Sequence, residues 1–240
     1  MAKLLLPNGE NVQISLNTSK VNNDLSITTE RYIVFLDIMG FKDRVARTKH
    51  EDLLSMLNDF NQSISRHILK HKEQGIRLSQ FSDSILIYSS DNSRNSLQII
   101  SEVSSEVMAT AISLGIPLKG AIAKGIVTCD TSKQLYFGQA LIDAYLLEEN
   151  VKYYGILAHS SVEADIKDME KNGFTLFRDI EAPLKSGTVS HYEICWYNND
   201  QTAEENLRKI RETVSGDPRK YIDNLSLIHI SEPTRLQLIS

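Results

Sequence analysis

The sequence is poor in the residues that build covalent or metal-linked scaffolds. Its two cysteines, Cys129 and Cys195, stand far apart, with neither a second cysteine nor a histidine at the short spacing that zinc ligands require. A disulfide framework and a cysteine-based zinc site are therefore excluded as sources of stability. Low cysteine content is typical of a reducing compartment, and we expect a cytoplasmic protein.

Long hydrophobic runs are also absent. The first residues, MAKLLLPNGE, hold three leucines before Pro7, which is too short for the core of a signal peptide or for a membrane span. We therefore predict neither secretion nor insertion into a membrane.

Positive charge is not in excess. The chain has 26 Lys and Arg residues against 31 Asp and Glu residues, a net charge of −5. Such a balance disfavours nonspecific binding to nucleic acid or to an anionic membrane, and we predict neither partner. Hydrophobic residues make up 41% of the chain and charged residues 24%, which is typical of a globular protein with a buried core.

A buried strand followed by a glycine turn is the first clear feature that is present. Residues 32–36, YIVFL, are continuously apolar and rich in β-branched and aromatic side chains, the pattern of a strand covered on both faces. The run stops at Asp37, and Gly40 follows shortly after it. The pattern predicts a strand that delivers a carboxylate to a turn.

The following elements alternate between helices and strands. Apolar spacing predicts helices at 51–73 and 97–114 and strands at 77–81, 85–89 and 118–127. The polar triplet Ser82-Asp83-Ser84 joins the first two of these strands as a hairpin. The order β-α-β-β-α-β predicts an α+β fold of the split βαβ, or ferredoxin-like, type, in which a four-stranded antiparallel sheet carries two helices on one face.

Changes in composition indicate the domain boundaries. A polar arm at 1–29 precedes one domain at 30–200, and a charged helix is expected at 201–224. Within the domain we also expect helices at 139–149 and 162–171 and strands at 155–158, 174–179 and 192–196. The segment 225–240 contains IHISEPTRL, which resembles a translated sequencing adapter, and we interpret it as a foreign tail.

Two aspartates are candidate metal ligands. In a split βαβ fold the first strand and the hairpin are neighbours in the sheet, so Asp37 at the strand end and Asp83 in the hairpin turn can converge. Paired carboxylates suit Mg²⁺ or Mn²⁺, which take oxygen ligands and offset the charge of phosphates. Taken one at a time, each aspartate is also an ordinary turn residue.

Four segments, in order, resemble the class III nucleotide cyclases. YIVFLDIMGF is similar to the family's first strand and turn, and QFSDSILIY to its hairpin with the second metal aspartate. KGAIAKGIV followed by YFGQALIDAYLLEE resembles the family's next strand, aromatic-glycine turn and helix, and LKSGTVSHYEI resembles its late hairpin. The matched motifs lie within residues 31–197, and they imply a class III cyclase palm domain.

The resemblance assigns roles to individual residues. It implies that Asp37 and Asp83 are catalytic and hold two divalent ions, Mn²⁺ or Mg²⁺, with the backbone carbonyl of Ile38 as a further ligand. It also implies that Gly40 and Phe41 form the turn that meets the triphosphate.

Developing charge on the leaving pyrophosphate requires a nearby cation. Lys185 lies in a matched motif and is the first candidate for this contact with the substrate. The other candidates are Lys42, Arg77, Lys119 and Lys124.

The departures from the family concern substrate recognition. Where purine cyclases read the base, this chain has Ser79 and Leu135, which we take as substrate-binding positions without a polar purine reader. Without such groups, discrimination by hydrogen bonds to a purine is not supported. Ile142 and Leu146 stand where the family has an asparagine and a transition-state arginine.

Among relatives, the combined motifs resemble the pyrimidine cyclases of the Pycsar antiphage system. This resemblance implies a substrate of UTP or CTP, a product of 3′,5′-cyclic UMP or cyclic CMP, and a downstream effector that responds to the cyclic nucleotide. The alternatives are an adenylate or guanylate cyclase, or a degenerate cyclase-like module that only dimerises or binds nucleotide.

A homodimer with shared active sites is expected as well. The strands at 32–36 and 118–127 are too apolar for one face of the sheet to lie in water, and a second copy would cover that face. Each site would then combine the metal ligands of one chain with residues 137–149 of the other.

Two other enzyme classes are disfavoured by single positions. A haloacid-dehalogenase-like phosphatase needs a second aspartate two residues after the first, and position 39 is a methionine. A diguanylate cyclase carries a Gly-Gly-Asp/Glu-Glu-Phe hairpin, whereas this hairpin turn is Ser82-Asp83-Ser84.

Overall fold

The computed structural model describes residues 2–5, 11–14, 27–197, 201–213 and 216–230. The rest of the arm expected at 1–29 and of the tail expected at 225–240 lies outside these residues. Within the arm, β1 (Ala2–Leu5) and β2 (Asn11–Ile14) pair with each other as an antiparallel sheet of their own.

The centre of the main sheet has the predicted topology. Its strands follow the order β4-β5-β3-β6-β8-β10-β9. The first four strands pair antiparallel with one another, and they are β4 (Arg77–Phe81), β5 (Ser84–Tyr88), β3 (Thr28–Ile38) and β6 (Leu118–Asp130). This is the strand order of a split βαβ unit, so the predicted α+β fold is confirmed.

The sheet is larger than the four strands expected. Beyond β6 it continues through strands from the later part of the chain, and a short strand pairs with the far end of β6. These additional strands are β8 (Ile156–Ala158), β10 (Gly187–Ile194), β9 (Phe177–Leu184) and, off the main path, β7 (Leu135–Gly138). The contact of β6 with β8 is parallel.

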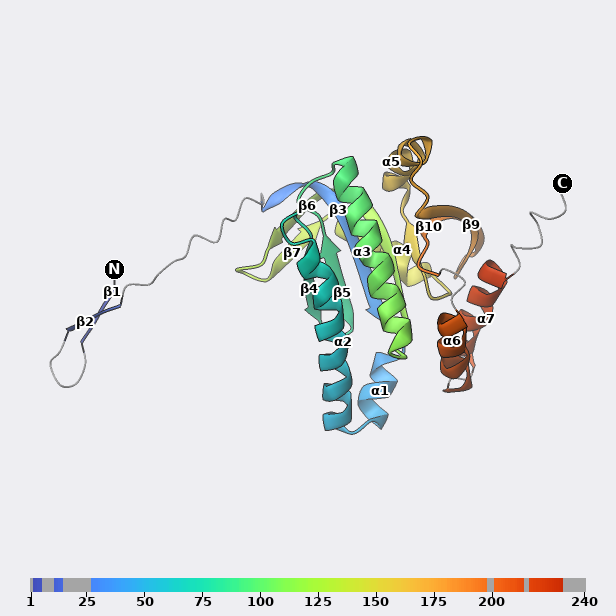
Figure 1. Cartoon of the computed structure of the whole chain (residues 1–240), viewed down its shortest axis with the longest axis horizontal. Coiled ribbons are helices and arrows are strands. Elements are labelled where there is room, and N and C mark those ends of the chain that lie inside the picture. Colours follow the sequence, from blue (N-terminus) through green and yellow to red (C-terminus); the bar gives the residue numbers. More distant parts are fainter. Residues whose placement is uncertain (1, 6–10, 15–26, 198–200, 214–215, 231–240) are drawn as a thin grey trace.

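Two long helices cover one face of the sheet. α2 (His50–Lys70) and α3 (Arg94–Ser113) lie side by side on it (Figure 1), as the apolar spacing predicted. They pack against alternate residues of β3, and Tyr32, Val34 and Leu36 are at most 1% exposed. Side chains alternate along a strand, so Ile33, Phe35 and Asp37 point to the opposite face.

The opposite face is covered in part by the same chain, which corrects the expectation that only a second copy would cover it. α4 (Gln139–Asn150) packs across β3 and β6 there. Ile33 and Ala123 of the sheet and Ala140 of the helix are fully buried in this contact. The small side chain of Ala140 lets the helix come close to the strand, since a Cβ placed on Gly125 would lie 3.4 Å from that of Ala140.

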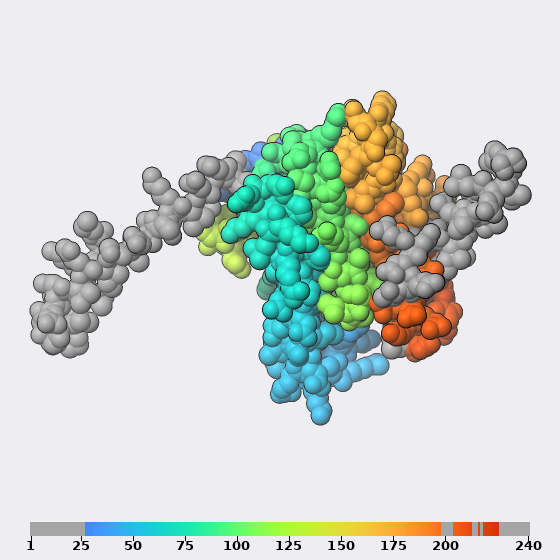
Figure 2. All heavy atoms as spheres, in the orientation of Figure 1, coloured from blue at the N-terminus to red at the C-terminus, as the bar shows by residue number. Residues whose placement is uncertain are grey.

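The remaining helices flank this core. α1 (Phe41–Arg47) follows β3, α5 (Ser160–Lys171) follows β8, and α6 (Gln201–Thr213) and α7 (Asp217–Ile230) follow β10. Figure 2 shows α2, α3, α5 and the α6–α7 pair next to one another on the visible surface. Within the described part of the chain, no helix combines the length and apolar character of a membrane span.

The C-terminal boundary differs from the expected one. Two helices replace the single charged helix predicted at 201–224, and α7 continues past 224 to Ile230. Leu225, the first residue of the expected tail, is 1% exposed and belongs to the hydrophobic core.

Candidate active site

The pairing of β3 with β5 brings Asp37 and Asp83 together. Asp37 is the Cα partner of Ser84, the first residue of β5. The backbone N–H of Ile38 donates to the carbonyl oxygen of Asp83 over 2.9 Å. The hairpin turn contains no glycine, and Ser82 adopts the left-handed conformation instead, with φ of 57°. Two carboxylates far apart in sequence thus share one end of the sheet.

A glycine turn forms the next wall of the pocket. The N–H of Met39 donates to the carbonyl of Pro117 over 2.9 Å, which ends β3 against the strand that follows α3. Gly40 then has a φ of 71°, a conformation that glycine adopts without strain, and it precedes α1. Ile38, Gly40 and Phe41 all line the pocket, and Lys42 follows at its edge.

A buried ion pair lies at the floor of the pocket. Lys119 is the Cα partner of Asp37 on β6. Its Nζ forms an ion pair with the Glu148 carboxylate at 2.8 Å and donates to the Glu148 backbone carbonyl at 2.9 Å. The two side chains are only 8% and 4% exposed. Because Glu148 is in the last turn of α4, this pair joins the helix end to the strand beside Asp37.

Negative charge dominates the electrostatics of the site. Burial, followed by the charges of Glu148 and Asp83, raises the pKa of Asp37 to about 7, although Lys119 and Lys42 act in the opposite direction. Burial also raises the pKa of Glu148, and Lys119 opposes that rise. Burial disfavours the ionised form of Asp37, and a cation bound next to it would stabilise that form.

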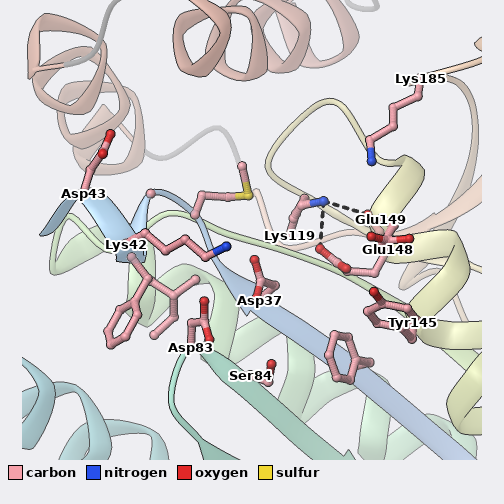
Figure 3. A pocket seen from close by; sticks show the side chains of 15 residues that line it. Asp37, Lys42, Asp43, Asp83, Ser84, Lys119, Tyr145, Glu148, Glu149 and Lys185 are labelled. Atoms are coloured by element: carbon pink, nitrogen blue, oxygen red, sulfur yellow. Dashed lines mark hydrogen bonds and ion pairs between the residues drawn. The ribbon is translucent and has the colours of Figure 1, made fainter. Parts of the chain in front are cut away.

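The pocket has a volume of about 490 Å³. Figure 3 shows Asp37 and Asp83 at its centre, with the ammonium of Lys42 directed toward them from one side and Lys185 reaching in from the other. Five acidic and three basic side chains line it: Asp37, Asp43, Asp83, Glu148, Glu149, Lys42, Lys119 and Lys185. A site with this excess of acid can hold a triphosphate only if cations accompany it.

An aromatic pair forms one side of the pocket. The rings of Phe35 on β3 and Tyr145 on α4 meet edge to face, with centroids 5.6 Å apart. Tyr145 is also hydrogen-bonded to Glu149, and this bond is the main reason that its pKa is raised. Residues Tyr145, Glu148 and Glu149 thus place the end of α4 in the same chain's pocket as Asp37.

The sequence-predicted residues separate into two groups. Asp37, Ile38, Gly40, Phe41, Asp83 and Lys185 all line this pocket. Ser79 on β4 and Leu135 on β7 do not, and Leu135 is 47% exposed at the far end of β6. A single chain therefore does not bring the two expected base-reading positions to the aspartates.

Two of the other cation candidates are engaged elsewhere. Lys124 forms an ion pair with Asp165 of α5, and the Arg77 guanidinium donates to the backbone carbonyl of Lys72. Lys42 and Lys119 remain at the pocket.

Three residues of α4 were not identified from the sequence. Tyr145, Glu148 and Glu149 line the pocket, and their spacing of three and four places them on one helix face. That spacing within YLLEE was the available signal. Nothing local shows that this helix crosses the sheet next to Asp37.

The described part of the chain supplies few candidate metal ligands at this site. Among the described residues, no group of three or more histidine, cysteine, aspartate or glutamate side chains is placed to hold a metal ion. Asp37 and Asp83 provide carboxylate oxygens, and Ile38 provides a backbone carbonyl. A cation at this site would need further oxygen ligands from water or from the substrate.

Solved structures with the same fold are class III nucleotide cyclase domains. The adenylyl cyclase CyaB from P. aeruginosa matches with a TM-score of 0.56 and 18% identity, over 72% of this chain and 97% of that one. The guanylate cyclase domain of RhGC from Catenaria anguillulae, solved in complex with GTP, gives 0.53 and 16%, over 70% and 96%.

A third match is the non-canonical dimeric guanylyl cyclase domain of the RhoGC fusion protein from the aquatic fungus Blastocladiella emersonii. Its TM-score is 0.54 and its identity 15%, over 69% of this chain and 96% of that one. No protein-family model and no curated protein matches the sequence. At these identities the likeness concerns the fold, and the described chain has the mixed α+β fold of class III cyclase catalytic domains.

Proposed function

We propose that this chain is a nucleotide cyclase that converts a nucleoside triphosphate to its 3′,5′-cyclic monophosphate and pyrophosphate. The observation that carries the proposal is the convergence of Asp37 and Asp83 beside the turn at Gly40, in a pocket of a cyclase fold. In the reaction the 3′-oxygen forms a bond to the α-phosphorus. The bond between the α-phosphorus and the oxygen that bridges it to the β-phosphorus breaks, pyrophosphate leaves with that oxygen, and the hydroxyl proton is released.

The residues at the site fit divalent ions. Two carboxylates meet in an acidic pocket, where burial first and then the charges of Glu148 and Asp83 raise the pKa of Asp37, while Lys119 and Lys42 lower it. Oxygen donors of this kind suit Mg²⁺ and Mn²⁺. Asp37, Asp83 and the carbonyl of Ile38 would hold the ions, which offset phosphate charge and make the 3′-hydroxyl easier to deprotonate.

The chain's own residues would bind and orient the triphosphate. Gly40 adopts the left-handed φ of 71° without strain, and the turn places the backbone of residues 38–41 in the pocket with the aspartates. Lys42 and Lys185 approach from opposite sides and would bind phosphate oxygens (Figure 3). Lys119 adds a fixed positive charge beneath Asp37, held in place by Glu148.

Turnover with purified protein tests the proposal. Each of the four nucleoside triphosphates is incubated with Mn²⁺ or Mg²⁺, and the products are separated by chromatography. We expect a cyclic monophosphate and pyrophosphate, and a loss of both in Asp37→Ala and in Asp83→Ala. Asp59→Ala is the matched control, because Asp59 is an exposed carboxylate on α2. Turnover that survives in either active-site variant contradicts the assignment.

We further propose that the substrate is UTP or CTP. The positions at which purine cyclases read the base hold Ser79 and Leu135, and neither offers the charged or acidic reader of those enzymes. Competition among the four triphosphates tests this point separately. A preference for ATP or GTP would leave the cyclase proposal standing and would make the chain an adenylate or guanylate cyclase. The Pycsar resemblance supports a product that acts as a signal for a separate effector.

A homodimer with shared sites is part of the proposal. α4 and the β6–β7 ribbon expose a set of large apolar side chains that are at least 47% accessible, namely Ile126, Leu135, Phe137, Ile142 and Leu146. Such a set is typical of a surface that meets another protein, and one structural relative is a non-canonical dimeric guanylyl cyclase domain. A second copy would bring its Leu135 and Phe137 toward the site of the first.

A degenerate module is the second candidate. Ile142 and Leu146 occupy exposed positions on α4 where the family has polar residues. If the chain binds a triphosphate and Mn²⁺ but yields no cyclic product from any of the four substrates, this candidate replaces the cyclase.

A further inference from the structure

Helix α7 packs on the loop that follows α4. Tyr221 and Ile222 are 7% and 2% exposed. The ring of Tyr221 stacks on that of Tyr154, with centroids 5.9 Å apart and planes 21° from parallel. The ammonium of Lys152 lies 5.3 Å from the centre of the Tyr221 ring. Asn224 donates its side-chain amide to the backbone carbonyl of Lys152 over 2.8 Å.

The same loop is bonded to the turn that carries Lys185. The N–H of Lys152 donates to the carbonyl of Pro183 over 2.9 Å, and the N–H of Lys185 donates to the carbonyl of Asn150 over 2.8 Å. Val151 and Leu184 form an isolated antiparallel bridge between these two bonds. The backbone of residues 150–152 therefore holds the end of β9, from which Lys185 projects into the pocket (Figure 3).

These contacts form a continuous connection from α7 to the pocket. One side of the loop is fixed by Tyr221 and Asn224, and the other side by the backbone of residues 183–185. The metal-site residues have a different support, because Ile38 and Asp83 are bonded to each other at the opposite wall of the pocket.

We propose that Tyr221 and Asn224 are positioning residues for the triphosphate, which act by fixing the loop at 151–154 and, through it, the backbone of Lys185. The inference rests on the proposed function, in which Lys185 binds phosphate oxygens. A long lysine side chain on an exposed turn loses much freedom when it binds, so a backbone that is already ordered lowers the cost of the contact.

The proposal predicts different effects on the binding of two ligands in the same pocket, triphosphate and Mn²⁺. Loosening α7 should weaken the binding of triphosphate, which needs Lys185. It should not weaken the binding of Mn²⁺ in the absence of triphosphate, because Asp37 and Asp83 lie on β3 and on the β4–β5 turn. A general loss of stability would affect both ligands together.

Hydrogen exchange tests the connection without any ligand or turnover. Asn224→Ala removes the amide that holds Lys152, and Tyr221→Leu removes the ring while keeping an apolar side chain. Arg219→Ala, an exposed position on the same helix, is the matched control. We expect faster exchange at the N–H groups of Lys152 and Lys185 in the first two variants only, with no change at Ile38. Unchanged exchange at Lys185 in both variants overturns the proposal.

Binding tests the consequence for the site. Inorganic triphosphate is titrated in excess Mn²⁺, and Mn²⁺ is titrated alone. Asn224→Ala should weaken triphosphate about three- to tenfold, the effect of one ordinary hydrogen bond, and leave the Mn²⁺ affinity unchanged. In a Lys185→Ala background the same substitution should have no further effect, since the group it positions is gone.

The two proposals fail in different ways. Equal weakening by Asn224→Ala with and without Lys185, or parallel losses of Mn²⁺ and triphosphate, would overturn the positioning role. If the variants show the expected exchange and binding effects but the wild-type protein cyclises no nucleotide, the positioning role is supported and the proposed cyclase activity is contradicted.

Discussion

Burial and the neighbouring carboxylates of Glu148 and Asp83 raise the pKa of Asp37 to about 7 from its ordinary value of 3.8. The folded, metal-free protein therefore binds a proton at Asp37 more tightly than the unfolded chain does. The contribution of Asp37 to the free energy of unfolding is fully present below pH 4. It is lost as the pH rises toward 7, where the carboxyl group ionises in the folded protein.

This residue gives a prediction with a defined sign. In the presence of a chelator at pH 8, Asp37→Asn should raise the free energy of unfolding by about 1–2 kcal/mol, a value reduced for partial solvent access, because it removes a disfavoured charge. At pH 4 the variant and the wild type should unfold at similar temperatures.

Thermal unfolding at both pH values measures the effect, with Asp59→Asn as the control. Addition of Mn²⁺ at pH 8 should make the wild type unfold at a higher temperature than Asp37→Asn, since only the wild type would be stabilised by binding the ion. A variant that is less stable than wild type at pH 8 without metal would contradict the argument.

The Lys119–Glu148 pair gives a second prediction at the scale of single residues. Glu148→Gln leaves the buried ammonium of Lys119 without its carboxylate, so it should cost roughly 3–5 kcal/mol in the free energy of unfolding. The double substitution Lys119→Met with Glu148→Leu should cost much less, because neither charge remains buried. Urea unfolding of the single and double variants decides the point. If both variants lose the same stability, the ion pair is not what holds the end of α4.

At the scale of elements, the contact of β6 with β3 depends on a glycine beside this pair. A Cβ added to Gly120 would lie 2.4 Å from Cδ2 of Leu36 and 2.5 Å from the carbonyl oxygen of Phe35. Gly120→Ala should therefore push the two strands apart and cost about 1–3 kcal/mol.

Gly125 in the same strand is the matched control, because the nearest atom to an added Cβ there is the Cβ of Ala140 at 3.4 Å. Gly125→Ala should have a small effect. Equilibrium unfolding compares the two variants, and equal stabilities would show that β6 adjusts without strain.

Helix α7 gives a prediction about the C-terminal boundary. Removal of residues 231–240 should leave the melting temperature unchanged. Removal of 225–240 should lower it, because Leu225 is 1% exposed and its loss opens the core. The expected cost is about 2–5 kcal/mol, as for other buried leucines. Thermal unfolding of the two truncated chains makes the comparison, and no loss in the shorter chain would support the foreign-tail interpretation from residue 225 onward.

At the scale of the whole molecule, the shared-site dimer predicts complementation between inactive chains. Asp37→Ala removes a metal ligand, and Phe137→Ala removes an aromatic side chain that is 56% exposed on β7. If each site combines Asp37 of one chain with Phe137 of the other, a mixed dimer has one site free of both substitutions. In an equal mixture that pairs at random, half of the dimers are mixed and each of these has one intact site of two, so we expect turnover to rise toward about a quarter of that of wild type.

Cross-linking or native mass spectrometry confirms that mixed dimers are present. Proven mixed dimers without recovery, or full activity of a monomer at the working concentration, would contradict sharing. The finding that Tyr145, Glu148 and Glu149 line the pocket of their own chain narrows the shared segment to the exposed side of α4 and to β7.

Much of the architecture was accessible from the sequence. The long helices α2 and α3 and the strands β3 to β6 have strong periodic patterns, and the predicted order matched the observed one. Short elements were missed for a physical reason. α1 buries none of its residues, and β7 has four residues, so neither shows a hydrophobic period.

The sequence by itself determined the order of the central elements and the two aspartates at their ends, because hydrophobic periodicity and turn chemistry are properties of neighbouring residues. Only the tertiary structure decided that α4 crosses the opposite face of the sheet, that Glu148 meets Lys119, and that α7 holds the loop next to Lys185. These contacts depend on which surfaces meet after the elements have formed. An apolar or charged helix face shows that it will pack against something, but its own sequence does not specify the partner.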